Sequence, residues 1–145
     1  MKDAYLHRIQ YYETDQMGIV HHSNYIRWFE EARDDFAARH GISYAEVEAR
    51  GVQMPVISVS CEYKTAALYG CEAAVFVRPC FFNGARLSYE YEVRSPDGGT
   101  LHAKGRSEHC FIDGVSRMPL NAKRRLPEYS EIMLRLVAES NGGET

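Results

Sequence analysis

The chain has 145 residues, of which 45% are hydrophobic and 26% are charged, and it carries a formal net charge of −3. This length fits one domain with a sizeable core, and the composition is typical of a globular protein. The densest group of cations is Lys123-Arg124-Arg125, which is a weak signal for nucleic acid. We therefore expect a single domain over residues 1–145 and no nucleic-acid partner.

The cysteines and the N-terminus indicate a reducing compartment. No Cys-x-x-Cys pair is present, and no histidine lies at zinc-ligand spacing from Cys61, Cys71, Cys80 or Cys110, so we expect reduced structural thiols and no metal. The N-terminus has no apolar h-region, and no apolar run approaches the roughly 20 residues that span a bilayer. A cytoplasmic protein without a membrane partner is expected.

The first third of the chain changes from a strand pattern to a helix pattern. Residues 4–12 are rich in aromatic and aliphatic side chains, which predicts a strand. Residues 24–39 are expected to form a helix whose apolar stripe consists of Tyr25, Trp28, Phe29, Ala32 and Phe36. Ser23 or Asn24 can cap its start, and Gly41 suits the position after its end.

The middle of the chain predicts a short helix and then strands. Ser43 and Glu46 form a capping-box pattern, and this helix should stop at Gly51. The apolar residues of 57–64 alternate with polar ones, as in a half-buried strand. Residues 71–82 are apolar on both faces, which predicts a central strand.

Two turns then lead to the last strands. Asn83-Gly84 predicts a two-residue type I′ hairpin, because both central residues of that turn need positive φ. Strands are expected at 86–94 and 100–112, on either side of a turn at residues 96–99. Small residues at Ala103, Gly105 and Ser107 would let the long helix approach that last strand closely.

The C-terminal region is expected to be irregular and basic between Pro119 and Pro127, and then helical over residues 128–139. Short hairpins force antiparallel pairing, and one apolar helix beside one sheet gives a two-layer α+β domain. We predict one long central helix packed against a five-stranded antiparallel sheet, with a short C-terminal helix.

The chemistry is expected in residues 11–33, where a polar turn with Asp15 and Gly18 precedes the long helix. A helix N-terminus has unpaired N–H groups and a partial positive charge, which can bind the oxygen of a polarised carbonyl. A carboxylate beside such donors could attack an acyl group. Asp15 could instead simply form the turn, and Glu13 is expected to be solvated.

Residues 14–30 read Thr-Asp-Gln-Met-Gly-Ile-Val-His-His-Ser-Asn-Tyr-Ile-Arg-Trp-Phe-Glu. This stretch resembles the signature of the 4-hydroxybenzoyl-CoA thioesterase family of hotdog-fold enzymes. The aspartate, the glycine, a hydrophobic pair and Asn-Tyr all stand at the family's spacing, and the resemblance covers roughly residues 4–138. It implies a single hotdog domain that hydrolyses acyl-CoA to a carboxylic acid and free CoA, without a cofactor.

The resemblance also implies roles for individual residues. Asp15 would be the nucleophile or the general base, and the backbone N–H at His22 would help polarise the thioester carbonyl. The His22 side chain could hydrogen-bond Asp15 or give a proton to the leaving thiolate. Gly18 would supply positive φ or room for substrate, and Tyr25 would line the acyl pocket or belong to the core.

Residues 62–67 resemble the family's segment after its second strand, although Ala66 stands where the family often has proline. That segment approaches the partner subunit's active site, so Lys64 and Thr65 are candidates for contacting substrate. A homodimer or homotetramer with inter-subunit active sites is therefore implied. An acyl-carrier-protein thioesterase and a non-catalytic acyl-CoA-binding module remain as alternatives, and the acyl group is open.

Overall fold

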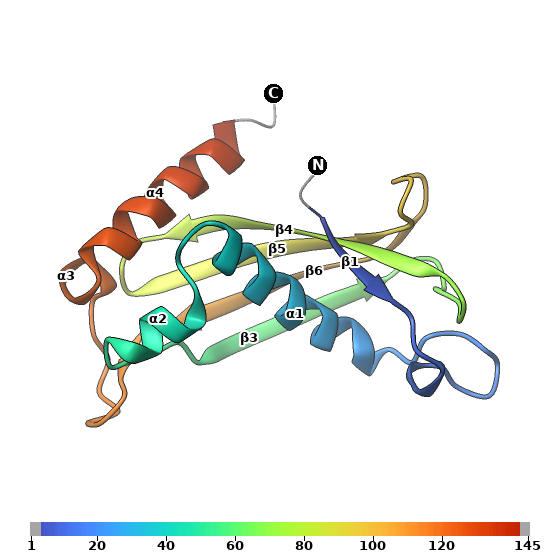
Figure 1. Cartoon of the computed structure of the whole chain (residues 1–145), viewed down its shortest axis with the longest axis horizontal. Coiled ribbons are helices and arrows are strands. Elements are labelled where there is room, and N and C mark those ends of the chain that lie inside the picture. Colours follow the sequence, from blue (N-terminus) through green and yellow to red (C-terminus); the bar gives the residue numbers. More distant parts are fainter. Residues whose placement is uncertain (1–3, 143–145) are drawn as a thin grey trace. The chain divides into compact units, whose positions relative to one another are not determined.

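The computed structural model describes residues 4–142, and its four helices and the five strands of its main sheet are labelled in Figure 1. The helices are α1 (Ser23–Arg39), α2 (Tyr44–Ala49), α3 (Ala122–Arg125) and α4 (Pro127–Gly142), together with a 3₁₀ turn at Tyr11–Glu13. The strands are β1 (Tyr5–Arg8), β2 (Val52–Gln53), β3 (Val56–Tyr63), β4 (Glu72–Phe82), β5 (Arg86–Arg94), β6 (Leu101–Cys110) and β7 (Ile112–Asp113).

Five strands form one sheet in the order β1-β4-β5-β6-β3, and β2 pairs with β7 in a separate antiparallel pair. The interior position predicted for β4 is confirmed. The chain folds as two compact units. Within the described residues, the first holds 4–36, 60–77 and 91–106, and the second holds 37–59, 78–90 and 107–142.

In the first unit, β1 pairs antiparallel with β4, with Tyr5 opposite Val75. The predicted strand over residues 4–12 is too long, because β1 ends at Arg8. The backbone N–H of Ile9 still donates to Cys71, at 3.2 Å. The Glu13 carboxylate then accepts the backbone N–H of Gln10 at 2.8 Å, which holds the chain in the 3₁₀ turn.

The long helix packs closely on β6 in the same unit, as predicted. Trp28, Phe29 and Ala32 have no exposed surface. The Phe29 ring stacks on Tyr91, with centroids 4.3 Å apart and an angle of 9° between the rings. A Cβ atom added at Gly105 would lie 2.5 Å from a Phe29 ring carbon. Glycine at 105 therefore permits the approach of helix to strand.

In the second unit, α1 ends at a glycine with left-handed backbone geometry. Gly41 has φ of +74°, its N–H donates to the carbonyl of Ala38 at 3.3 Å, and the Ile42 N–H donates to Ala37 at 2.9 Å. These two bonds are those of a Schellman motif. Ser43 then caps α2 by accepting the Glu46 N–H at 3.3 Å, so the predicted positions of Gly41 and Ser43 at these helix ends are confirmed.

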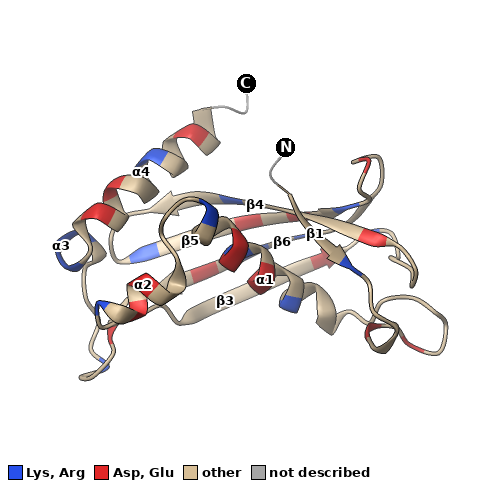
Figure 2. Ribbon diagram, viewed as in Figure 1, with Lys and Arg blue, Asp and Glu red and all other residues tan. Residues whose placement is uncertain are grey.

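The core of the second unit is built around the buried side of α4. Tyr129, Met133 and Leu136 are buried, together with Phe111. Helix α4 is longer than the predicted segment 128–139. The segment expected to be irregular contains α3, because the Asn121 side chain accepts the Lys123 N–H at 2.8 Å and caps a basic turn (Figure 2).

The turn after β4 differs from the predicted hairpin. Three residues, 83–85, connect the strands, and of these only Gly84 has positive φ. Asn83 accepts the N–H groups of Ala85 and Arg86 on its side-chain oxygen, at 2.9 and 2.8 Å. The asparagine thus acts through its side chain, which replaces the second positive-φ position of a type I′ turn.

Strand β3 forms where it was predicted, but neither of its faces is buried in the single chain. Val56, Ile57, Val59 and Tyr63 are 40–50% exposed. The reason is that β3 is the last strand of the sheet. The four cysteines form no disulfide within the described chain, and Cys71 is exposed rather than buried. No helix in residues 4–142 has the length and hydropathy needed to cross a bilayer.

Candidate active site

Asp15 lies in a tight loop that connects the 3₁₀ turn to α1. Thr14 pairs with Val20 across the base of this loop, and the Asp15 N–H donates to Ile19 at 2.9 Å. Gly18 has φ of +78°, which confirms the predicted positive φ, and a Cβ added there would meet nothing within 4 Å. Glycine is therefore required at 18 by its conformation and not by close packing.

The Asp15 carboxylate is half-buried and takes part in the turn. Its Oδ1 accepts the backbone N–H of Met17 at 2.8 Å, which is an Asx turn. Within residues 4–142, the only side-chain hydrogen bond of Asp15 is this one. The other carboxylate oxygen is thus available to a ligand or to water.

The start of α1 is built differently from the prediction. Neither Ser23 nor Asn24 caps the helix with its side chain. His21 does so, because its Nδ1 accepts the Ser23 N–H at 3.2 Å. Asn24 is buried and turns its amide away from the helix, to donate to the Glu13 carbonyl at 2.9 Å.

Most backbone N–H groups at this helix start have acceptors. That of His21 donates to Glu13 at 2.8 Å, that of Asn24 to His21 at 3.0 Å, and that of Tyr25 to His22 at 3.3 Å. Among the hydrogen bonds of residues 4–142, none is donated by the His22 N–H. This is the donor that an incoming oxygen could use at the positive end of the helix.

The exposed His22 side chain lies beside His21 and Tyr63. The ring centroids of the two histidines are 4.2 Å apart, and that of Tyr63 is 6.1 Å from His22. The Tyr63 hydroxyl donates to the His22 carbonyl at 3.3 Å. Sequence reasoning did not select Tyr63, although it stands directly before Lys64 in the segment that resembles the family.

Tyr25 is buried, with 3% of its surface exposed, and its ring is 5.0 Å from Trp28 and 5.3 Å from Tyr63. Burial raises the pKa of Tyr25, although a hydrogen bond from the Ala67 backbone opposes this effect. The ring therefore belongs to the core at the point where the core meets the site.

Lys64 and Thr65 are exposed and follow directly on β3. Their backbone N–H groups both donate to the His102 carbonyl, at 2.8 and 3.2 Å. The Lys64 ammonium pairs with Glu62 at 3.0 Å. The chain then reaches the Asp15 loop, where the Ala67 carbonyl accepts the Val20 N–H at 2.9 Å.

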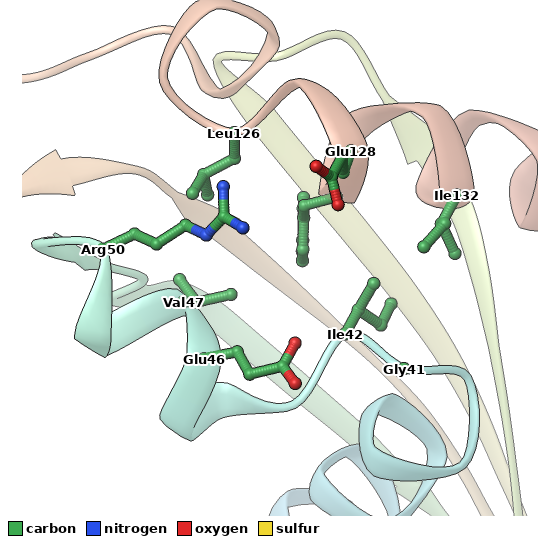
Figure 3. Close-up of a pocket in the computed structure, with 9 residues that line it drawn as sticks. Gly41, Ile42, Glu46, Val47, Arg50, Leu126, Glu128 and Ile132 are labelled. Carbon is green, nitrogen blue, oxygen red and sulfur yellow. The ribbon is translucent and has the colours of Figure 1, made fainter.

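The structure thus brings three segments together in one unit: the 14–20 loop, the start of α1 and residues 63–68. Asp15 and Gly18 lie on the first, His22 and Tyr25 on the second, and Lys64 and Thr65 on the third. A small groove of about 50 Å³ in the other unit, lined by Ile42, Val47 and Ile132 among others, contains none of these residues (Figure 3).

The prediction that Glu13 is solvated is wrong. Only 5% of its surface is exposed, and its carboxylate accepts hydrogen bonds from the Trp28 indole at 2.9 Å and from His7 at 2.9 Å. Burial alone would raise the pKa of Glu13, but the hydrogen bonds from Gln10, His7 and Trp28 lower it below its ordinary value. The one available signal was Trp28, whose buried indole N–H needs an acceptor.

Comparison with known families identifies this arrangement. The family model described as the thioesterase-like superfamily matches residues 9–135. The chain belongs to this superfamily. Its five-stranded antiparallel sheet is that of the hotdog thioesterase fold, and the predicted class of enzyme, a thioester hydrolase, is confirmed.

Several relatives in the superfamily are similar over most of their length. One is the Bacillus subtilis (strain 168) protein named "Putative acyl-CoA thioesterase YneP", which is 35% identical over 121 residues, covering 83% of this chain and 87% of the relative. Another is 1,4-dihydroxy-2-naphthoyl-CoA hydrolase from Synechococcus sp. (strain CC9311), 25% identical over 117 residues and covering 75% and 76% of the two chains.

A solved structure is also close to this chain. The DHNA-CoA thioesterase from Staphylococcus aureus superimposes with a TM-score of 0.90 and 30% identity, over 98% of this chain and 95% of that one.

Proposed function

We propose that the protein hydrolyses acyl-CoA to a carboxylic acid and free CoA, as a member of the 4-hydroxybenzoyl-CoA thioesterase family within its superfamily. The observation that carries this proposal is the pairing of two features. Asp15 has an unused carboxylate oxygen in a fixed turn, and the next helix starts with a backbone N–H at His22 that has no acceptor in residues 4–142.

The chemistry follows from these two groups. The thioester carbonyl oxygen accepts the His22 N–H at the positive end of α1, which stabilises the negative charge that develops there. The Asp15 oxygen either attacks the carbonyl carbon or removes a proton from the attacking water. Attack by Asp15 breaks the C–S bond, releases the CoA thiolate and leaves a mixed anhydride, which water then splits into carboxylic acid and Asp15.

The His22 side chain is assigned to catalysis, and the other site residues are assigned to substrate binding. The exposed His22 imidazole would either give a proton to the departing thiolate or hydrogen-bond Asp15. Gly18 leaves open space beside the loop. Lys64 and Thr65 are exposed at the end of β3, where they can contact substrate, and Tyr25 borders the acyl group from the core.

The assembly is proposed to be a homodimer or homotetramer of single-domain subunits in the cytoplasm, with active sites shared between subunits. The support is β3, a sheet-edge strand with Val56, Ile57, Val59 and Tyr63 at 40–50% exposure. Unpaired apolar edge strands are normally covered. Light scattering of a dilute sample should give at least a dimer, and an active monomer would contradict a shared site.

The acyl group is best sought with a panel. Two relatives are named for one substrate, 1,4-dihydroxy-2-naphthoyl-CoA (DHNA-CoA), so a fused aromatic thioester belongs beside acetyl, medium-chain and long-chain ones. Thiol release from each CoA ester would be followed for the wild type and for Asp15→Asn. Loss of turnover by orders of magnitude in the variant, with binding and fold retained, is the expected result.

Asp97→Asn is the matched control for this substitution. Asp97 also sits in a turn before a glycine, and its Oδ1 accepts the N–H two residues on, that of Gly99, at 2.9 Å. It lies in the β5–β6 connection, and its side-chain hydrogen bonds in residues 4–142 are to Ser95 and Gly99. Equal activity of the Asp15 variant and the wild type would contradict the proposal. Release only from carrier-protein thioesters would replace CoA as the substrate, and release from none would favour a binding module.

A further inference from the structure

We infer that Glu13 is a positioning residue for the proposed hydrolysis: it fixes both ends of the segment that carries Asp15 and His22. The expected effect of Glu13 on turnover rests on the proposed function. The Glu13 carboxylate itself is buried and takes no part in the proposed chemistry. Glu13 stands two residues before Asp15 and touches neither Asp15 nor the His22 side chain by any hydrogen bond in residues 4–142.

The carboxylate of Glu13 ties the beginning of the segment to the middle of the helix. Its Oε2 accepts the Trp28 indole N–H at 2.9 Å, and its Oε1 accepts the Gln10 backbone N–H at 2.8 Å. Trp28 is entirely buried and lies on α1, so it is held by the packing of that helix. The 3₁₀ turn is thus attached to a rigid part of the fold.

The backbone carbonyl of Glu13 ties down the far end of the segment. It accepts the His21 backbone N–H at 2.8 Å and the Asn24 side-chain amide at 2.9 Å. These two residues flank His22, whose N–H is the proposed donor to the substrate carbonyl. Glu13 therefore holds the 14–22 segment at both ends: its carbonyl accepts hydrogen bonds at the start of α1, and its carboxylate accepts one from Trp28.

His7 connects Glu13 to a second carboxylate nearer the surface. The Nε2 of His7 lies 2.9 Å from Glu13, and its Nδ1 lies 3.2 Å from Glu31. Glu31 also accepts the Tyr5 hydroxyl, at 2.8 Å. The Glu31 side chain is 44% exposed, and none of its described hydrogen bonds reaches residues 10–24. Glu31 therefore shares the His7 partner with Glu13 but not the loop.

This difference supplies a matched pair of variants, Glu13→Gln and Glu31→Gln. Each removes one negative charge beside His7 and keeps the shape of the side chain. In Glu13→Gln, an amide N–H₂ must replace either Oε1 or Oε2, so the hydrogen bond from the Gln10 N–H or the one from the Trp28 indole is lost. In Glu31→Gln, the loop keeps every one of its contacts.

The test measures kcat and KM for CoA-ester hydrolysis in both variants, with amide hydrogen exchange in peptides covering residues 14–22 and α4. We expect Glu13→Gln to lower kcat by about 10²-fold, as a misplacement of about 1 Å can do, with KM changed less than about threefold. Exchange should accelerate in 14–22 and stay unchanged in α4. Glu31→Gln should match the wild type in all of these quantities.

Two results would overturn the inference. One is a Glu13→Gln enzyme with wild-type kcat and a protected 14–22 segment. The other is an equal loss in both variants, which would trace the effect to charge beside His7. The single tryptophan of the chain gives an independent check, because its indole N–H resonance should move in Glu13→Gln and not in Glu31→Gln.

Asn24→Ala covers the case in which Glu13→Gln fails to fold. It removes the hydrogen bond from the Asn24 side-chain amide to the Glu13 carbonyl without changing any charge. It should lower kcat and accelerate amide exchange in residues 14–22, as Glu13→Gln does. Wild-type values of both would count against the inference. A wild type that hydrolyses no thioester would refute the proposed function alone. Amide exchange in residues 14–22 of Glu13→Gln and Glu31→Gln would then still show whether Glu13 holds the loop in place.

Discussion

The two ends of helix α1 are built in contrasting ways. The C-terminal end is local: Gly41 at positive φ lets two backbone N–H groups bond to Ala37 and Ala38. The N-terminal end is held by groups outside the helix: the His21 side chain accepts the Ser23 N–H, and Glu13, ten residues before the helix, accepts the Asn24 amide and the Trp28 indole N–H. The first arrangement uses its polar groups within the backbone, whereas the second leaves the His22 N–H for another molecule. A helix end that is held by residues outside the helix can leave one backbone N–H group without an acceptor, so that this group can bind a substrate.

The largest effect that sharpens this contrast is expected from His21→Ala. It removes the acceptor of the Ser23 N–H, which costs about 0.5–2 kcal/mol of stability. Because His22 is the next residue, kcat should also fall by roughly tenfold or more. Urea unfolding and thiol release would be measured on the same preparation. His21→Asn restores a side-chain acceptor and should recover part of kcat, and a His21→Ala enzyme with unchanged kcat would break the contrast.

A smaller effect, confined to stability, is expected at the other end. Gly41→Ala puts a Cβ on a residue with φ of +74°, in open space, so the cost is the left-handed conformation itself, about 1–2 kcal/mol. The urea midpoint should fall while kcat stays at the wild-type value. Since His21→Ala and Gly41→Ala cost similar stability, a kcat loss in both would mean that catalysis responds to helix stability in general.

The smallest effect is a pH dependence at the N-terminal end. The pKa of Glu13 lies below its ordinary value in the fold. A carboxyl group whose pKa is lowered by folding stabilises the fold at pH values above its pKa in the unfolded chain, about 4.3 for Glu. This stabilisation is lost as the pH falls through the pKa of the group in the folded protein. The groups that face Glu13 are His7 and, beyond it, Glu31 and Tyr5. The wild-type Tm should therefore drop below pH ~4.3 more steeply than that of Glu13→Gln, and parallel curves would contradict this assignment.

The same contrast explains what the sequence could predict. The helix α1, its buried stripe and its end at Gly41 depend on residues within one or two turns of each other, and these predictions are confirmed. The burial of Glu13 depends on Trp28 and His7, at sequence distances of 15 and 6 residues. No local pattern contains such pairs, so the prediction of a solvated Glu13 failed.

The candidate site divides along the same line. Asp15, Gly18 and His22 stand in one contiguous motif, and the structure places them on one loop and the helix start that follows it. Tyr63 joins them only because the end of β3 comes back to His22, 41 residues earlier. The exposure of β3 likewise follows from its position at the edge of the sheet, and the turn at Asn83 from hydrogen bonds to its side chain. The residue types that predict strands and hairpins give neither.

The central difference between the two ends of α1 is that the N-terminal end is proposed to bind a carbonyl oxygen and the C-terminal end is not. The most direct measurement is the backbone amide chemical shift of His22 during titration with a non-hydrolysable acyl-CoA thioester analogue that keeps the carbonyl. We predict a downfield shift of the His22 amide proton that saturates with binding, while the amides of Gly41 and Ile42 do not move. If binding saturates and the His22 amide proton does not shift, the His22 N–H does not bind the carbonyl oxygen.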